Sequence, residues 1–478
     1  MNVLLINPPI RLTDNPYVFP IGLGYIASSL IQAGHKVEAL DINGQRWPEE
    51  EVRQKINARI KEFDAVGVGG LITTYKYVKW LISVIKEARP NIPVIVGDNG
   101  ATFSYHLYLE KAKADIAVIG EGDMTIKEVI KAIEKKSDLT SVKGVVFKSD
   151  GKIFKTPPRE RIEHLDELPY PQRDIFPIEK YITSPLSRMG GMRFLVLSAT
   201  RGCPYRCKFC YPAFGRVVKL RSARSIVDEI KFIKERYNLD CVGFTDDLFI
   251  INRKRVLEFC QLLIEEEVDI KWCSTARADL VDSDILKKMK ESGCFWLGYG
   301  IESANPHVLF DMKKGFTVEQ ASNGVRLTKM AGIFCATTWI IGWPNETPKS
   351  VRDTMKFIIR EELPFLGLNY ATPYPGSELY DDFVRSGRIE DEESFIMKLG
   401  DARDFVVNLT CMPDEQLIRL KDKLFNILGE RFGPFTVRLL KISPKAFQYV
   451  IKFFWFLRFW GFVPTMKRVI KYYQKYKS

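Results

Sequence analysis

The first 202 residues contain no cysteine, although the chain of 478 residues has nine. Nine scattered thiols do not form a disulfide framework in a chain of this length, and they fit a reducing cytosol that keeps thiolates available for metal. The N-terminal sequence MNVLLINPP lacks a basic segment and an apolar stretch, so no signal peptide is expected. No run of about 20 uncharged apolar residues occurs, which argues against a membrane-spanning helix. We therefore expect a cytoplasmic protein.

Acidic residues are absent from residues 433–478, which contain ten lysines and arginines and thirteen aromatic residues. This segment supplies most of the net charge of +12, and the rest of the chain is nearly balanced. Aromatic and basic residues without acids favour a helix lying on an anionic membrane, here its inner face. A helix packed on the rest of the protein is the alternative. Binding of nucleic acid by this segment is a third possibility, since basic and aromatic residues also suit phosphates and bases. We rank it last and expect no nucleic-acid partner.

Alternating strands and helices are indicated for the first 145 residues, in a chain whose length predicts two or three domains. Glycine-bearing loops at the ends of the strands predict an α/β fold with a doubly wound parallel sheet, which binds ligands at the carboxyl edge of its strands. The predicted strands are Val3–Ile6, Lys36–Leu40, Ala65–Val68, Pro93–Val96 and Ile116–Ile119, and the predicted helices are Gly22–Ala33, Tyr75–Ala88 and Met124–Lys135.

Three further regions follow this first domain of residues 1–145. Residues 146–192 are rich in proline, charge and turn signals, which predicts a hairpin and then an extended linker. Residues 193–400 show about six strand–helix repeats, enough for a partial barrel but fewer than the eight of a closed one. Residues 401–478 read as helical, with Thr410 or Asp414 capping a helix that ends near Leu428.

Three cysteines lie within eight residues, in the sequence Arg201-Gly-Cys203-Pro-Tyr-Arg-Cys207-Lys-Phe-Cys210. Their C-x-x-x-C-x-x-C spacing lets three thiolates of one loop reach three irons of a 4Fe–4S cubane, which leaves the fourth iron without a protein ligand. An open iron suits a cluster that must bind and reduce a substrate. A zinc knuckle is the alternative, but it needs four ligands, and no other cysteine or histidine lies within thirty residues on either side.

At these residues the chain resembles the radical S-adenosylmethionine superfamily, in which this spacing occupies the loop after the first barrel strand. A predicted strand, Phe194–Ser198, ends just before the loop. The resemblance implies that S-adenosylmethionine chelates the open iron. One electron from an external reductant such as flavodoxin or ferredoxin then cleaves it to a 5′-deoxyadenosyl radical. Cys203, Cys207 and Cys210 are, on this resemblance, the cluster ligands and the catalytic residues.

Further segments at the predicted strand ends resemble those that bind S-adenosylmethionine in this superfamily. They comprise the aromatic residue before the last cysteine, an acidic pair, an arginine and a G-x-E-S segment, so the implied contacts are Phe209, Asp246, Arg277, Gly300, Glu302 and Ser303. Taken singly, Asp246 could be a helix N-cap and Glu302 a turn residue. Their succession after a cluster loop favours a cosubstrate site, and this resemblance covers about residues 190–380.

The N-terminal loops resemble those of the cobalamin-binding domain that precedes the barrel in one large subclass. The implied cobalamin contacts are Asn7, Pro8, Gly22, Leu23, Tyr25, Thr73, Asp98, Gly120, Glu121 and Gly122. Many cobalamin domains bind cobalt through the histidine of a D-x-H-x-x-G motif, and the comparable loop here, Asp41-Ile-Asn43-Gly44, has none. Members of the subclass commonly bind cobalamin without it. A degenerate, purely structural domain is the alternative.

Taken together, these resemblances imply a cobalamin-dependent radical enzyme that methylates an unactivated carbon. A membrane-bound tail would favour a hydrophobic small-molecule substrate, such as a lipid, an isoprenoid or a porphyrin-like compound. A radical cyclase or C–C bond-forming enzyme of the same architecture is the alternative among enzymes. In another class, the chain could be a non-catalytic membrane or lipid-binding protein on a radical fold, against which the intact cysteine triad argues.

Overall fold

The computed structural model describes residues 1–10, 18–183, 192–211, 213–363 and 365–430. The segment 433–478, for which a membrane contact is expected, lies outside the described residues. Within the described part of the chain, no helix has the length and hydropathy needed to cross a bilayer.

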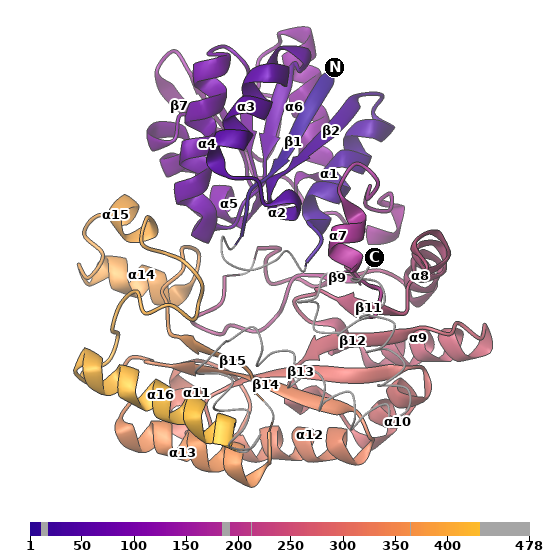
Figure 1. Ribbon diagram of the computed structural model, residues 1–478, viewed down its shortest axis with the longest axis vertical. Helices are drawn as coiled ribbons and strands as arrows, with labels where there is room; N and C mark the ends of the chain where they lie inside the picture. The colour runs from indigo at the N-terminus through magenta and orange to yellow at the C-terminus, as the bar shows by residue number, and fades with distance from the viewer. Residues whose placement is uncertain (11–17, 184–191, 212, 364, 431–478) are drawn as a thin grey trace, which may run out of the picture.

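A seven-stranded sheet occupies the N-terminal part of the chain (Figure 1). The strand order is β2-β1-β3-β4-β5-β6-β7; the first five strands pair in parallel, and β6 and β7 add an antiparallel hairpin at one edge. The predicted doubly wound parallel sheet is confirmed, and the hairpin expected at the start of the linker extends it. The strands are β1 (Asn2–Asn7), β2 (Lys36–Asp41), β3 (Ala65–Val68), β4 (Val94–Val96), β5 (Ile116–Val118), β6 (Val145–Ser149) and β7 (Lys152–Lys155).

Helices cover both faces of this sheet. Side chains of α1 and α6 pack on one face, and those of α3, α4 and α5 pack on the other. The polar helix α3 was not predicted, because only Val52 and Ile56 of its residues are buried. The helices are α1 (Ile21–Gln32), α2 (Ile42–Gln45), α3 (Glu49–Arg59), α4 (Tyr75–Ala88), α5 (Asp98–His106) and α6 (Gly122–Lys135).

The linker packs closely on the N-terminal sheet through α7 (Ile178–Ile182) and the residues before it. Gln172 N donates to the carbonyl oxygen of Gly24 over 3.0 Å. A Cβ at Gly24 would lie 2.9 Å from the side chain of Pro171, so a glycine is needed for this close approach. In α7, the Tyr181 hydroxyl donates to Asp41 Oδ2 over 2.8 Å. These contacts hold the linker against the sheet edge that faces the barrel.

Six parallel strands form the second sheet, in the order β15-β14-β13-β12-β11-β8. Each strand pairs with its predecessor in the series, as the predicted partial barrel requires. Cys273 and Cys335 are buried in its core, as expected for small core residues. The strands are β8 (Phe194–Leu197), β11 (Cys241–Phe244), β12 (Lys271–Ala276), β13 (Cys294–Glu302), β14 (Phe334–Ile341) and β15 (Phe365–Tyr370), and the helices are α8 (Ala223–Tyr237), α9 (Arg253–Glu265), α10 (Ser283–Glu291), α11 (Pro306–Asp311), α12 (Val318–Met330) and α13 (Pro348–Arg360).

The segment after β15 returns to the N-terminal sheet before it ends on the barrel (Figure 1). It contains α14 (Glu378–Arg385), α15 (Glu392–Ile396) and α16 (Asp414–Glu430). Glu392 at the start of α15 lies 2.6 Å from His106 Nε2. Ile396 and Leu399 join the hydrophobic core of the N-terminal sheet, so this segment clamps the two sheets together.

Two buried arginines share one glutamate where the linker meets α8. Arg173 Nη2 donates to Glu229 Oε1 over 2.7 Å, and Arg221 donates to Glu229 Oε2. The side chains of Arg173, Arg221 and Glu229 are 1%, 5% and 0% exposed. Buried charges of this kind are stable only as a complete set, because desolvation penalises any charge left unpaired.

We expect Glu229→Gln to lower the free energy of unfolding by about 3–5 kcal/mol, since it leaves two buried guanidinium groups without a counter-ion. Asp228→Asn, the control on the same helix, removes a half-exposed carboxylate and should leave the midpoint nearly unchanged. Urea denaturation followed by tryptophan fluorescence compares the two variants. Equal midpoints would contradict this account.

A buried carboxyl group closes the turn after β14. Gly342 N donates to Glu346 Oε2 over 2.6 Å. Burial raises the pKa of Glu346 to about 7, although backbone hydrogen bonds from Gly342 and Trp343 oppose the shift. The folded protein therefore keeps a proton that the unfolded chain loses near pH 4.5. Stability is lost as the pH rises between these two values, and the loss is complete above the folded pKa.

Glu346→Gln keeps an acceptor oxygen but cannot ionise, so it should abolish this part of the pH dependence. We expect the stability of the wild type relative to the variant to fall by ~3 kcal/mol between pH 4.5 and pH 7 and then to stay constant. Thermal denaturation of both proteins at one-unit pH intervals measures the difference. A difference that does not change with pH would rule the explanation out.

Candidate functional site

The three clustered cysteines lie in a loop, residues 202–218, at the carboxyl end of the first barrel strand. The loop is closed by the antiparallel pair β9 (Thr200–Arg201) and β10 (Lys219–Leu220). Gly202 opens it at φ +94, and a Cβ there would lie 2.5 Å from the carbonyl oxygen of Val217. Cys203 N donates to the carbonyl oxygen of Gly215 over 3.2 Å. The two ends of the loop can meet this closely because the first residue is glycine.

All three thiols are free; Cys207 is buried, Cys203 is half-buried and Cys210 is exposed. Although solvent reaches Cys210, the surrounding protein desolvates its thiol and raises its pKa to about 12, with further contributions from Cys207, Asp247 and Cys203. No three His, Cys, Asp or Glu side chains among the described residues converge as on a single metal ion. A cubane differs, because it takes one thiolate on each of three irons. Three soft donors in one loop fit such a cluster.

Two carboxylates after β11 hold the backbone that leads into this loop. Asp246 Oδ1 accepts hydrogen bonds from the amides of Ala199 and Thr200 over 2.7 and 2.9 Å. Asp247 Oδ2 accepts one from Gly202 N over 3.1 Å. Burial raises the pKa of Asp246 to about 6, and its buried Oδ2 has no hydrogen-bond partner among the residues that the structure describes. Asp246 is thus neither a helix N-cap nor open to the barrel interior: one oxygen anchors the cluster loop.

The predicted contact Arg277 also acts on the cluster loop. Its Nε and Nη2 each donate to the Asp279 carboxylate over 3.0 Å, and its Nη1 donates to the carbonyl oxygen of Lys314 over 2.8 Å. The guanidinium carbon lies 3.5 Å from the centroid of the Tyr205 ring, between the first two cysteines. Three of the five N–H donors of Arg277 are therefore used within the protein. Its guanidinium group also packs against Tyr205 of the cluster loop.

An ammonium, a carboxylate and an aromatic ring gather at the end of β13. A Cβ at Gly300 would lie 2.5 Å from Glu302 Oε1, so Gly300 allows the carboxylate to fold back over the strand. Glu302 has φ +71, a region that few residues other than glycine adopt. Its Oε1 lies 3.6 Å from Lys314 Nζ, which lies 5.6 Å from the centroid of the Phe209 ring. Burial raises the pKa of Glu302, and Lys314 opposes the shift.

Ser303, the last residue of the G-x-E-S segment, lies in a structural position. Its side chain is fully buried. The Oγ accepts a hydrogen bond from Asn305 N over 3.2 Å and lies 3.5 Å from Thr354 Oγ1. Ser303 therefore orders the start of α11.

The carboxyl ends of the N-terminal strands point towards the barrel (Figure 1). The predicted cobalamin contacts lie along this edge or in the turns and helices that start there. Asn7 and Pro8 lie at β1, Gly22, Leu23 and Tyr25 in α1, Thr73 in the 3₁₀ turn Ile72–Thr74, Asp98 after β4, and Gly120, Glu121 and Gly122 after β5. The structure thus brings together residues that are up to 115 positions apart in the sequence.

Open space and unpaired polar atoms characterise this edge. Among the described residues, no atom beyond the chain neighbours lies within 4 Å of the place where a Cβ would stand on Gly22, Gly97 or Gly120. Asn99 Oδ1 and Tyr108 Oη are buried, and neither has a hydrogen-bond partner in the described part of the chain. Glycines without neighbouring side chains leave room for a large flat ligand, and the unpaired polar atoms can bind amide groups at its edge. A corrin is a ligand of this kind.

Other predicted contacts at this edge already serve the protein. Asn7 Nδ2 donates to Asp41 Oδ1 over 2.8 Å in a buried cluster with Tyr181. Asp98 adopts φ +72 and is accessible to solvent, yet the protein around it raises the pKa of its carboxyl group by burial.

Sequence reasoning gave Arg201 no role, but the structure places it between the two sheets. Its Nη1 donates to Glu121 Oε1 over 3.0 Å and to Asp123 Oδ2 over 2.8 Å, and its Nη2 donates to Asp123 Oδ1 over 3.0 Å. The rings of Tyr25 and Phe214 each lie 5.2 Å from the guanidinium carbon. Although burial opposes its charge, Asp123 and Glu121 raise the pKa of Arg201 above its usual value. No local pattern signals this pairing.

Aromatic residues form a second bridge between the sheets, next to the last cysteine. The Tyr211 ring lies 6.1 Å from the Phe103 ring of α5 and 6.2 Å from the Tyr374 ring after β15, measured between centroids. Like Asp98, Asp247 is accessible to solvent, yet burial raises its pKa. The side chains of Asp98 and Asp247 thus resemble that of Cys210: each is accessible to solvent, and burial raises the pKa of each.

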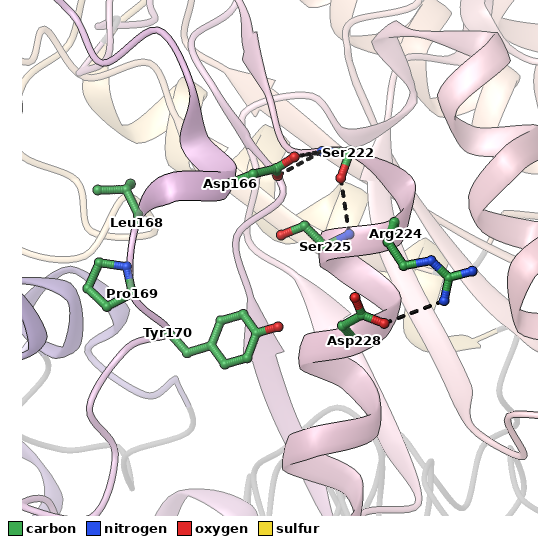
Figure 2. Close-up of a pocket in the computed structure, with 8 residues that line it drawn as sticks. All are labelled: Asp166, Leu168, Pro169, Tyr170, Ser222, Arg224, Ser225 and Asp228. Carbon is green, nitrogen blue, oxygen red and sulfur yellow. Dashed lines mark hydrogen bonds and ion pairs between the residues drawn. The ribbon is translucent and has the colours of Figure 1, made fainter.

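A surface hollow of about 430 Å³ lies elsewhere, between the linker and the start of α8 (Figure 2). Asp166 accepts a hydrogen bond from Ser222 N over 2.9 Å, and Ser222 Oγ accepts one from Ser225 N over 3.1 Å. These polar groups cap the helix, and none of the predicted site residues lines the hollow.

Comparisons with known proteins match two separate segments of the chain to family models. Residues 197–358 match the family model of the radical SAM superfamily, and residues 9–130 match that of the B12 binding domain. The chain is 32% identical over 390 residues to an uncharacterized methyltransferase of Pyrococcus horikoshii, which covers 80% of this chain and 83% of the relative. It is 29% identical over 387 residues to the anaerobic magnesium-protoporphyrin IX monomethyl ester cyclase of Rubrivivax gelatinosus. This match covers 79% of this chain and 68% of the cyclase.

Among solved structures, the chain is similar to the radical S-adenosylmethionine methyltransferase TsrM from Kitasatospora setae. The complex of TsrM with tryptophan and an S-adenosylmethionine analogue has a TM-score of 0.69 at 20% identity, over 81% of this chain and 76% of TsrM. Another TsrM structure, with cobalamin and a [4Fe-4S] cluster bound, has a TM-score of 0.68. The likeness shows the same fold. With both family models matched in this order, the chain belongs to the radical S-adenosylmethionine superfamily and carries a B12-binding domain before its barrel.

Proposed function

We propose that this chain is a cobalamin-dependent radical S-adenosylmethionine methyltransferase acting on an unactivated carbon of a hydrophobic small molecule. The observation that carries the proposal is that the carboxyl edge of the N-terminal sheet meets the cluster loop of the barrel (Figure 1). On one side lies a loop with three free thiols, and on the other an open strand edge with unused polar atoms. Two cofactors held on these two walls would meet a substrate placed between them.

Cys203, Cys207 and Cys210 would hold the cluster, and the edge that contains Gly97 and Gly120 would hold cobalamin. When bound, the cluster supplies one electron for cleavage of S-adenosylmethionine, and cobalamin supplies a carrier for the methyl group. The protein holds the start of the cluster loop in place, because backbone amides there are bound to carboxylates after β11.

Glu302, Lys314 and Phe209 would bind the cosubstrate. A carboxylate and an ammonium 3.6 Å apart complement the α-ammonium and α-carboxylate groups of an amino acid. Phe209 offers a ring face beside Cys210 on which the adenine can lie. Lys314 is an addition to the contacts that the sequence predicts. Arg277 and Asp246 would act indirectly, by holding the loop.

Phe103, Tyr211 and Tyr374, which lie between the two sheets, would give an apolar surface suited to a lipid-, isoprenoid- or porphyrin-like substrate. An external one-electron reductant such as flavodoxin or ferredoxin belongs to the proposal, because the chain must receive each electron from outside. Contact of residues 433–478 with the inner face of an anionic membrane also belongs to it, on the composition of that segment alone.

A radical cyclase is the second candidate, since one relative at 29% identity is named as a cyclase. Methyl-labelled S-adenosylmethionine separates the two reactions. Label in the product supports methyl transfer, whereas 5′-deoxyadenosine with an unlabelled product supports cyclisation.

We expect Cys210→Ser to lower the iron content of anaerobically reconstituted protein from about four atoms per chain and to abolish 5′-deoxyadenosine formation from S-adenosylmethionine. Serine is a poor ligand for this cluster because its hydroxyl is hard and stays protonated. Cys411→Ser is the control, since Cys411 is also free and exposed but lies outside the loop. Iron analysis and chromatography of the products provide the readouts. Equal loss in both variants would refute the assignment.

Gly97→Leu should prevent corrinoid binding without unfolding the protein. Gly97 has an extended backbone, and no described atom beyond its chain neighbours lies within 4 Å of its missing Cβ. The leucine therefore fits, but it fills the space above β4. Asn91→Leu adds the same side chain to an exposed residue at the opposite end of β4 and serves as the control. Corrinoid retained after gel filtration, measured by absorbance, should be lost in the first variant alone. Retention by both would contradict the proposed site.

A further inference from the structure

Arg201 makes a buried charged contact between the loop proposed to hold the cluster and the edge proposed to hold cobalamin. This residue lies two positions before Cys203, and its side chain is 6% exposed. Asp123, at the first turn of α6, accepts from both terminal nitrogens of the guanidinium. Glu121, next to Gly120, accepts from Nη1. One planar cation therefore ties the loop after β5 to the backbone that starts the cluster loop.

The carboxylate of Glu121 is held on both sides. Its Oε1 faces Arg201, while its Oε2 accepts from Ile162 N of the linker over 2.9 Å. Arg161 reaches back to the cluster loop, since its Nη2 donates to the carbonyl oxygen of Arg201 over 3.3 Å. A shift of Glu121 must therefore move Arg201, the linker, or both, because buried charges cannot be left unpaired at low cost.

The free side of the same loop is the open space above Gly120. A ligand seated there would restrict the loop that carries Glu121 and Asp123. S-adenosylmethionine bound at the cluster would restrict the loop that carries Arg201. If each ligand orders one of the two loops that this ion pair joins, the first ligand to bind reduces the conformational entropy that the second must remove. Each ligand then favours binding of the other.

We infer that Arg201, through Asp123 and Glu121, couples corrinoid binding at the N-terminal sheet to S-adenosylmethionine binding at the cluster. Arg201 is thus a positioning residue, and the inference rests on the proposed function. Linkage is reciprocal, so either ligand must raise the affinity for the other by the same factor. Couplings of this kind commonly amount to about 5–150-fold. Because the ion pair is buried, the factor should change little with salt.

The test is titration of cluster-loaded protein with aquacobalamin, followed by quenching of tryptophan fluorescence, with and without saturating S-adenosylmethionine. We expect the cosubstrate to lower the Kd of the wild type at least about fivefold. Asp123→Asn keeps the shape and one acceptor oxygen but removes the charge, and Arg201→Lys keeps the charge but loses the bidentate contact. Both should bring the ratio of the two Kd values close to one.

Glu163→Gln is the matched control. Glu163 pairs with Lys219 across the linker and β10, but its side chain is 68% exposed. This variant should keep the wild-type ratio. Electron paramagnetic resonance of the reduced cluster with S-adenosylmethionine adds a second readout: its spectrum should respond to corrinoid in the wild type and in Glu163→Gln only. Iron content and the thermal midpoint verify that each variant is folded and loaded.

A wild-type ratio of one would overturn the inference, while corrinoid binding and 5′-deoxyadenosine formation would leave the proposed function standing. An unchanged ratio in Asp123→Asn and Arg201→Lys would also overturn it. Wild-type protein that binds no corrinoid at all would overturn both the inference and the proposed cofactor.

Discussion

The carboxyl edges of two parallel sheets meet across one buried guanidinium group. Arg201 belongs to the barrel, while Asp123 and Glu121 belong to the N-terminal sheet. Parallel sheets present their functional loops at the carboxyl ends of their strands, and here the two sets of loops face each other. A cation removed from water is tolerated only with its carboxylates in place. The relative position of the two sheets at this point therefore follows from charge pairing as well as from apolar contact.

The same physical rule recurs around the site. Glu229 holds two arginines where the linker meets α8, and the carboxylate of Asp246 holds two backbone amides before the cluster loop. Arg277 donates hydrogen bonds to Asp279 and to the carbonyl group of Lys314, and its guanidinium group packs against the Tyr205 ring. These buried polar contacts define single geometries, because each would leave an unsatisfied charge if it shifted. The backbone at the start of the cluster loop is thus held by buried polar contacts.

Much of the fold was accessible from local pattern. The strand–helix alternation predicted both sheets and their parallel pairing, because burial on both faces leaves short apolar strands and amphipathic helices in the sequence. The polar α3 was missed, since only Val52 and Ile56 of its residues reach the core. Membership of the β6–β7 hairpin in the N-terminal sheet was also missed, because strand pairing depends on partners far along the chain.

Part of the candidate site could also be predicted from the sequence, and part could not. The spacing of Cys203, Cys207 and Cys210 was sufficient to predict three thiols in one loop, because eight consecutive residues cannot lie far apart. The direction and partners of a long polar side chain depend instead on what the fold brings near it. Only the tertiary structure could therefore pair Arg201 with Asp123 and bring Lys314 to the proposed cosubstrate site. The length of the chain between two residues determines which side chains meet within one loop. Tertiary packing determines which side chains meet across the contact between the two sheets.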